Sequence, residues 1–188
     1  MPIIGIQASS TRQGLATSSF YSLDTYLVTT PQASITFSNI DQTFKHLFAH
    51  VSGRCGSDGN ADFQICVNGA TSSWNEIYMY LSNGSFSAGA TSNVRRAPAL
   101  GNFLSATGNV SGLGTSVAYV NIADYSAAKY HHVQMYGGQY NGSANNAQMT
   151  SGFNTADANP VTSIRFEAEA QSRTFGTGTR ISLYGLKG

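Results

Sequence analysis

Arg180 to Gly188 reads RISLYGLKG and is the clearest β-strand of the chain. Its apolar Ile181 and Leu183 alternate with Ser182 and Tyr184, which is the two-residue period of a strand with one buried face. Because a strand needs a paired neighbour to be stable, we expect these residues to lie inside a sheet. The pattern therefore predicts that this end of the chain is fixed in the fold and is not a loose tail.

Short alternating segments rich in Val, Ile, Thr, Tyr and Phe fill most of the chain after residue 23. Asn-Gly pairs at 68–69, 83–84 and 141–142 separate several of them, and both residue types tolerate the positive φ that tight turns need. No window of ten or more residues shows the apolar stripe of a helix. We predict strands over 24–30, 33–40, 44–53, 61–68, 74–82, 116–124, 130–140, 145–153, 161–169 and 179–187.

One face of each predicted strand is apolar, so two sheets must cover each other. We predict an all-β fold: a single two-sheet antiparallel β-sandwich, jelly-roll-like, over residues 24–188, after an irregular N-terminal arm over residues 1–23. Residues 85–114 carry the weakest pattern and are predicted to form a long loop with one or two short strands. The residues expected to face the core are Ile35, Phe37, Leu47, Ala49, Val51, Phe63, Ile65, Val67, Val120, Ile122, Val133, Met135, Ile164, Phe166, Ala168, Ile181 and Leu183.

The composition excludes several classes of function. Charged residues are only 10% of the 188, and the formal net charge of +1 leaves no basic field for nucleic acid or for an acidic membrane. No apolar run approaches the roughly 20 residues of a membrane span. Met1 to Ile6 has neither the charged start nor the long apolar core of a secretory signal, so we expect synthesis in a cytosol without Sec export.

No set of residues in the chain predicts catalysis, a metal or a cofactor. Cys55 and Cys66 are eleven positions apart, and in a cytosolic chain we expect free thiols, with a disulfide across the hairpin as the alternative. Glu167 and Glu169 share one face of a predicted strand at a separation that glycosidase carboxylates can have. Arg165 stands beside them, so an ion pair or plain solvation is the ordinary outcome, and we predict no enzyme.

The predicted strand 74–82 is unusual because both of its faces carry large side chains. Aromatic rings with a polar tip anchor protein interfaces and also stack on sugars. We predict that Trp74, Tyr78 and Tyr80 line an interface between copies or with a partner. Burial inside the domain and a glycan-binding face, with Tyr136 and Tyr140 added, are the alternatives. The opposite face carries Ile77, Met79 and Leu81.

Five segments taken together resemble those of bacteriophage virion structural proteins, of the β-sandwich head decoration or tail-appendage type. They occur in the same order as in that group and span most of the chain. The segments are ASSTRQGLATSSF from Ala8, ITFSNIDQTFKHL from Ile35, VNIADYSAAKYHHV from Val120, VTSIRF from Val161 and the closing RISLYGLKG.

The resemblance implies a non-enzymatic virion protein on the outer surface of the particle, assembled in the host cytoplasm. A capsid decoration or cement protein is the leading expectation, and a tail or neck appendage that recognises host-surface glycans is the alternative. The implied partners are other copies, as a homotrimer, and the major capsid protein or another virion protein. We expect Ile3, Ile4 and Ile6 of the arm to anchor the protein to the shell.

Overall fold

The computed structural model describes residues 20–56, 60–94, 99–104, 115–140, 145–168 and 171–187. Within these ranges the chain forms twelve β-strands and no α-helix. The strands are β1 (Phe20–Leu27), β2 (Ser34–Ser38), β3 (His46–Gly53), β4 (Ala61–Val67), β5 (Trp74–Ser82), β6 (Ser85–Val94), β7 (Ala99–Leu104), β8 (Thr115–Ile122), β9 (His132–Tyr140), β10 (Asn145–Asn154), β11 (Ser163–Ala168) and β12 (Arg180–Leu186).

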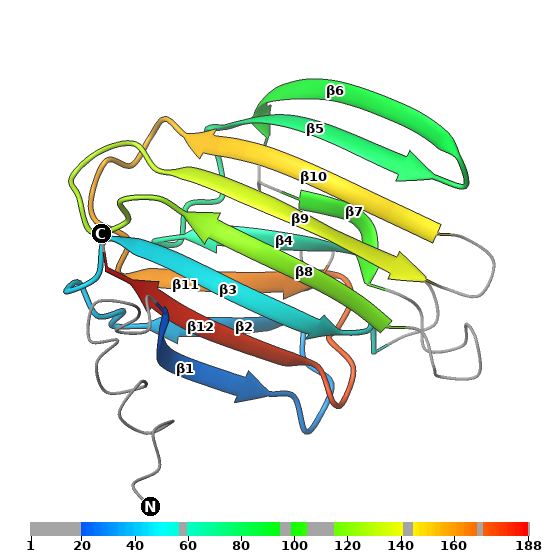
Figure 1. The fold of residues 1–188 in the computed structure, drawn as a ribbon, viewed down its shortest axis with the longest axis horizontal. Coiled ribbons are helices and arrows are strands. Elements are labelled where there is room, and N and C mark those ends of the chain that lie inside the picture. The colour runs from blue at the N-terminus through cyan, green and yellow to red at the C-terminus, as the bar shows by residue number, and fades with distance from the viewer. Residues whose placement is uncertain are drawn as a thin grey trace, which may run out of the picture.

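The strands form two antiparallel sheets that stack face to face (Figure 1). The large sheet has eight strands in the order β1-β12-β3-β8-β9-β10-β5-β6, and the small sheet has four in the order β2-β11-β4-β7. In Figure 1 the large sheet faces the viewer, with β1 at its lower edge and β6 at its upper edge. The prediction of an all-β, two-sheet sandwich is confirmed.

The order of the strands is that of a jelly roll with two added hairpins. The pairs β1 and β2, β3 and β4, β7 and β8, and β11 and β12 each cross from one sheet to the other. This crossing gives two facing sets, β1-β12-β3-β8 and β2-β11-β4-β7, as in an eight-stranded jelly roll. The remaining strands, β9 with β10 and β5 with β6, widen the large sheet only, so it extends past the edge of the small one.

A row of phenylalanines on the small sheet forms the centre of the core. Phe166 on β11 contacts Phe37 on β2 edge to face, with ring centroids 5.9 Å apart, and stacks on Phe63 of β4 at 5.7 Å. Phe175, from the loop before β12, closes the row at 6.3 Å from Phe63. All the residues predicted to face the core are buried.

The closing strand lies inside the large sheet, where β12 pairs with β1 on one side and β3 on the other. Ile181 and Leu183 are buried, as predicted. Gly185 is required by packing, because a Cβ at this position would lie 2.4 Å from the ring of Phe44. The glycine of the SLYG phrase therefore makes room for an aromatic ring of the core.

Two boundaries differ from the predictions. Strand β1 begins at Phe20, so the predicted end of the arm at residue 23 falls inside a strand. Residues 85–94 form one of the longest strands, β6, because the Asn83-Gly84 turn returns the chain directly along β5. Its run of Ser, Ala and Gly hides this strand from a reading based on β-branched and aromatic residues.

Trp74 is fully buried in the core, so the prediction that it lines an interface is wrong for this fold. It begins β5 on the face that points toward the small sheet, opposite Asn154 of β10. The aromatic face of β5 therefore points inward and not toward a partner. The face that carries Ile77 points to solvent, where Ile77 is 63% exposed.

Replacing Trp74 by Ala should lower the free energy of unfolding by about 3–5 kcal/mol, the usual cost of a large cavity. Trp74→Phe should cost less, because the indole N–H has no hydrogen-bond partner among the described residues. The matched control is Ile77→Ala on the solvent face of the same strand, which should change stability by about 0.5 kcal/mol or less. Urea unfolding measures all three, and equal losses for Trp74→Ala and Ile77→Ala would contradict the assignment of faces.

Candidate functional site

The outer face of the large sheet is the surface of this molecule that departs most from an ordinary solvated surface. The small sheet covers part of the other face, and no described segment lies over this one (Figure 1). In most two-sheet sandwiches the outward positions are polar. Here the outward positions of β10, β5 and β6 carry Met149, Phe153, Ile77 and Phe86, and all four are substantially exposed.

At its described positions this face also lacks carboxylate, ammonium and guanidinium side chains over six neighbouring strands. Its only titratable groups there besides Tyr are histidines such as His50 and His132. From β3 through β8, β9, β10 and β5 to β6, the described outward positions hold no Asp, Glu, Lys or Arg. Glu76 of β5, which points inward, is the single such residue in these strands. An uncharged, partly apolar face of this kind is typical of a surface that another molecule covers.

Aromatic rings form a continuous row across the β1 half of this face. Phe20 contacts Phe48 at 5.4 Å, Phe48 contacts Tyr119 at 5.8 Å, and Tyr119 stacks on Tyr136 at 5.0 Å. Met149 of β10 lies opposite Tyr136 and continues the row, and Met79 of β5 lies opposite Met149. The row crosses from β1 to β5 and joins the aromatic rings of β1, β3, β8 and β9 to the exposed apolar side chains of β10 and β5.

The face is large enough for a specific interface. Six strands about 4.8 Å apart and about eight residues long give a flat area on the order of 600 Å². A standard protein interface buries about 800 Å² per partner, and the largest apolar patch of a typical monomer is about 300–600 Å². The outer face is therefore comparable with one side of a stable protein contact. We define the outer face as the outward residues of β3, β8, β9, β10, β5 and β6.

The predicted interface residues other than Trp74 lie on the opposite, inward face of the large sheet. Tyr78 is half-buried, and its hydroxyl lies over Gly89 of β6. Tyr80 is 38% exposed, and its ring stacks on that of Tyr78 with centroids 6.4 Å apart. Ile3, Ile4 and Ile6 lie outside the described residues.

The sequence of β10 contains apolar residues that indicate the outer face, although the strand pattern alone does not show this. Met149 and Phe153 alternate with Thr150 and Gly152 in the strand before the β10–β11 loop. Apolar residues in such a strand normally mark the buried face, yet the polar face of β10 is the one that points inward, where Thr150 is buried. Only the order of the strands, which puts β10 beside β5, shows that Met149 and Ile77 belong to one surface.

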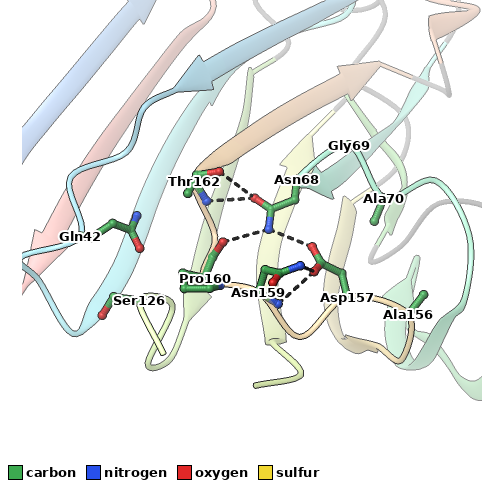
Figure 2. Close-up of a pocket in the computed structure, with 10 residues that line it drawn as sticks. All are labelled: Gln42, Asn68, Gly69, Ala70, Ser126, Ala156, Asp157, Asn159, Pro160 and Thr162. Carbon is green, nitrogen blue, oxygen red and sulfur yellow. Dashed lines mark hydrogen bonds between the residues drawn. The ribbon is translucent and has the colours of Figure 1, made fainter. Parts of the chain in front are cut away.

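A hollow at one end of the sandwich, with Asn68, Asp157, Asn159 and Thr162 among its lining residues, has a volume of about 730 Å³ (Figure 2). Asn68, which follows β4 with φ of 47°, lies at its centre. Its amide nitrogen donates to Asp157 Oδ2 at 2.9 Å and to the Pro160 carbonyl at 3.0 Å, and its amide oxygen accepts from the Thr162 N–H at 2.9 Å.

These hydrogen bonds satisfy the polar groups of the hollow within the chain itself. Asp157 Oδ1 accepts from both nitrogens of Asn159, at 2.9 and 2.8 Å, and Gln42 donates to the Ile40 and Val161 carbonyls. No polar group among them is aimed into the hollow without a partner. The hydrogen bonds of the hollow therefore hold the β10–β11 connection against the end of β4. The geometry of the hollow does not indicate a ligand.

Glu167, one of the two carboxylates considered for catalysis, is fully buried in a structural ion pair. Arg165 Nε lies 2.5 Å from Glu167 Oε1, and Gln171 donates to the same oxygen at 2.8 Å. Burial is the largest single effect and lowers the pKa of Arg165, but Glu167 and Cys66 together raise this pKa by more, so the guanidinium stays charged. Glu169 lies outside the described residues.

Cys55 and Cys66 are both buried and are not joined by a disulfide, as predicted. In the ranges the structure covers, no cluster of three or more His, Cys, Asp and Glu side chains is placed to hold a metal ion. Those ranges also contain no helix long and apolar enough to cross a membrane.

No protein-family model, curated protein or solved structure matches this chain.

Replacing Asn68 tests whether its hydrogen bonds stabilise the fold by holding the β10–β11 connection against β4. Asn68→Gly keeps a residue that accepts positive φ and removes the side-chain hydrogen bonds, so we expect a loss of about 1–3 kcal/mol in the free energy of unfolding. Asn68→Ala adds the strain of positive φ and should cost about 1 kcal/mol more. Equal stability of Asn68→Gly and wild type in urea unfolding would show that these bonds contribute nothing.

The Asp157 carboxylate predicts an acid-sensitive contribution to stability. Burial raises its pKa, but hydrogen bonds from Asn159 and Asn68 lower it by more, so the folded pKa lies below the ordinary value of an aspartate. A depressed folded pKa stabilises the fold above the unfolded pKa, and this contribution is lost as pH falls through the folded value. We expect the urea midpoint to fall more steeply below about pH 4 in wild type than in Asp157→Asn. Parallel pH profiles would contradict this assignment.

Proposed function

We propose that the chain is a non-enzymatic structural protein of a bacteriophage virion, a capsid decoration or cement subunit that binds the outside of the shell. The observation that carries the proposal is the outer face, an uncharged surface on the order of 600 Å² with large apolar side chains exposed. We expect a surface of this kind to act by binding a partner that covers it. The order of the five segments that resemble phage virion proteins supports the choice of particle.

The energy available from the outer face suits a protein that binds in many copies. If about 400 Å² of the face is apolar, its burial contributes about 10 kcal/mol before costs. The loss of translational and rotational freedom on association removes 4–15 kcal/mol of that. One copy alone would therefore bind weakly or moderately, and contacts between neighbouring copies on a shell would add to the affinity.

The N-terminal arm supplies a second anchor in this proposal. Ile3, Ile4 and Ile6 would insert into the shell while the outer face covers the surface beside it. Two linked contacts bind more tightly than either does alone, because the second forms within the first complex.

A tail or neck appendage that recognises host glycans is the second candidate function, favoured by the stacked and partly exposed Tyr80. Sugars stack on an exposed ring face. On the outer face, however, Tyr119 stacks on Tyr136 and Phe48 lies tilted against Tyr119, so these rings partly cover one another's faces. This arrangement presents ring edges and hydroxyl tips, which suit a protein partner better than a sugar.

A charge placed on the outer face should abolish particle binding. Met149→Lys puts an ammonium group between Tyr136 and Met79, and we expect at least about tenfold weaker binding to empty capsids of the same phage, measured by co-sedimentation. Thr36→Lys is the control, since Thr36 is exposed on the outer side of the small sheet.

Stoichiometric capsid binding by wild type and by Thr36→Lys, with loss in Met149→Lys, supports decoration by this face. Binding to a glycan array without capsid binding would replace decoration by the appendage function. Full capsid binding by Met149→Lys would remove the outer face from the contact.

A further inference from the structure

The outer edge of β6 is an edge of the large sheet that no other described strand pairs with. In the described part of the chain, β6 pairs with β5 on one side and with no strand on the other. Such an edge presents a row of backbone N–H and C=O groups that can pair with another strand. Charges, prolines and bulges are the usual means of blocking an edge. The segment from Ser85 to Ser92 contains no charge and no proline, and the bulge of this strand comes only after it, at residue 93.

The other described edge of the same sheet is blocked. Strand β1 carries the charged Asp24, and its register shifts at a bulge between Ser22 and Asp24. The edges of the small sheet, β2 and β7, are short, at five and six residues. The regular part of β6 is therefore the longest edge in the described structure that is open to pairing.

The turn before β6 determines which backbone groups are open. Asn83 and Gly84 have φ of 48° and 81°, the conformation of a type I′ turn, so Ser82 and Ser85 form the hydrogen-bonded pair that flanks it. Hydrogen-bonded and free positions then alternate along the strand. The backbone groups of Phe86, Ala88 and Ala90 consequently point away from β5, and their side chains lie on the outer face.

We propose that β6 pairs with β6 of a second copy, antiparallel, about a two-fold axis at Ala88. This contact joins two eight-stranded sheets into one continuous sheet and unites their outer faces. A two-fold axis normal to the sheet sets each residue opposite one on the same face, so Phe86 lies opposite Ala90 of the second copy and Ala88 opposite its own equivalent.

A second copy fits this edge for two reasons. The register sets the bulky ring of Phe86 against the small side chain of Ala90 at both ends of the contact, so the edge is complementary to itself. The segment has no charge to repel its own copy or to attract a partner of opposite sign. The pairing does not depend on the proposed particle binding. It competes with the three-fold ring implied by the family resemblance.

The test is the mass of the full chain in solution, by sedimentation velocity over a range of concentrations. We expect wild type at twice the 19.9 kDa of one chain. Ala88→Lys sets two ammonium groups against each other at the axis and should raise the dissociation constant at least about tenfold. Ala88 is exposed in the single chain, so the variant should fold, and circular dichroism checks this. Ala147→Lys, exposed on the outer face of β10, adds the same charge away from the edge and should remain dimeric.

Amide hydrogen exchange locates the contact. In wild type, the amides of Phe86, Ala88 and Ala90 should exchange slowly at high protein concentration and quickly on dilution, whereas in Ala88→Lys they should exchange quickly at both. A wild-type mass of one or three chains would overturn the proposal. So would a dimer that Ala88→Lys leaves intact, or a loss of the dimer in Ala147→Lys alone, which would assign the contact to the outer face.

Discussion

The phenylalanine row of the small sheet is the interaction on which the rest of the structure depends. Phe37, Phe166 and Phe63 lie side by side on three neighbouring strands, and Phe175 joins them from the loop before β12. They fill the space between the sheets where the jelly-roll strands face each other. The small sheet is only four strands wide, so it covers only part of the large one. The extra hairpins widen the large sheet beyond this cover, and the edge of β6 is a consequence of that widening.

Much of the fold could be predicted from the sequence because the core positions obey a simple period. Ile164, Phe166 and Ala168 alternate with Ser163, Arg165 and Glu167, and burial follows that alternation on the inner side. The same holds for Leu47, Ala49 and Val51 of β3. In such strands the single apolar face packs against the opposite sheet, so periodicity alone predicts both the strand and its inner side. Periodicity did not predict the burial of Glu167. Its position in β11 points away from the core, but its side chain is buried and accepts a hydrogen bond from Gln171 of the following loop.

The candidate surface could not be predicted because it depends on which strands are neighbours. Strand β5 carries large side chains on both faces, and nothing within the strand says which face meets the small sheet. Pairing with β10 sets Trp74 opposite Asn154 and Met79 opposite Met149, which places Trp74 inside and Met79 outside. The role of Asn68 was hidden for a similar reason, because its partners Asp157 and Pro160 are about ninety positions away in the chain.

The close approach of Gly185 to Phe44 couples the closing segment of the chain to a segment far away in the sequence. The glycine lies in SLYG and the ring lies in TFKHL, two of the segments that carry the resemblance to virion proteins, and the two residues touch across the core. A pair in contact is constrained jointly, so chains that fold in this way should change at these two positions together or at neither. A side chain in place of the glycine would be tolerated only where a smaller residue replaces the phenylalanine. Sharing both phrases is thus a signature of a common way of packing the end of the sheet, and it can identify related folds among proteins with different roles.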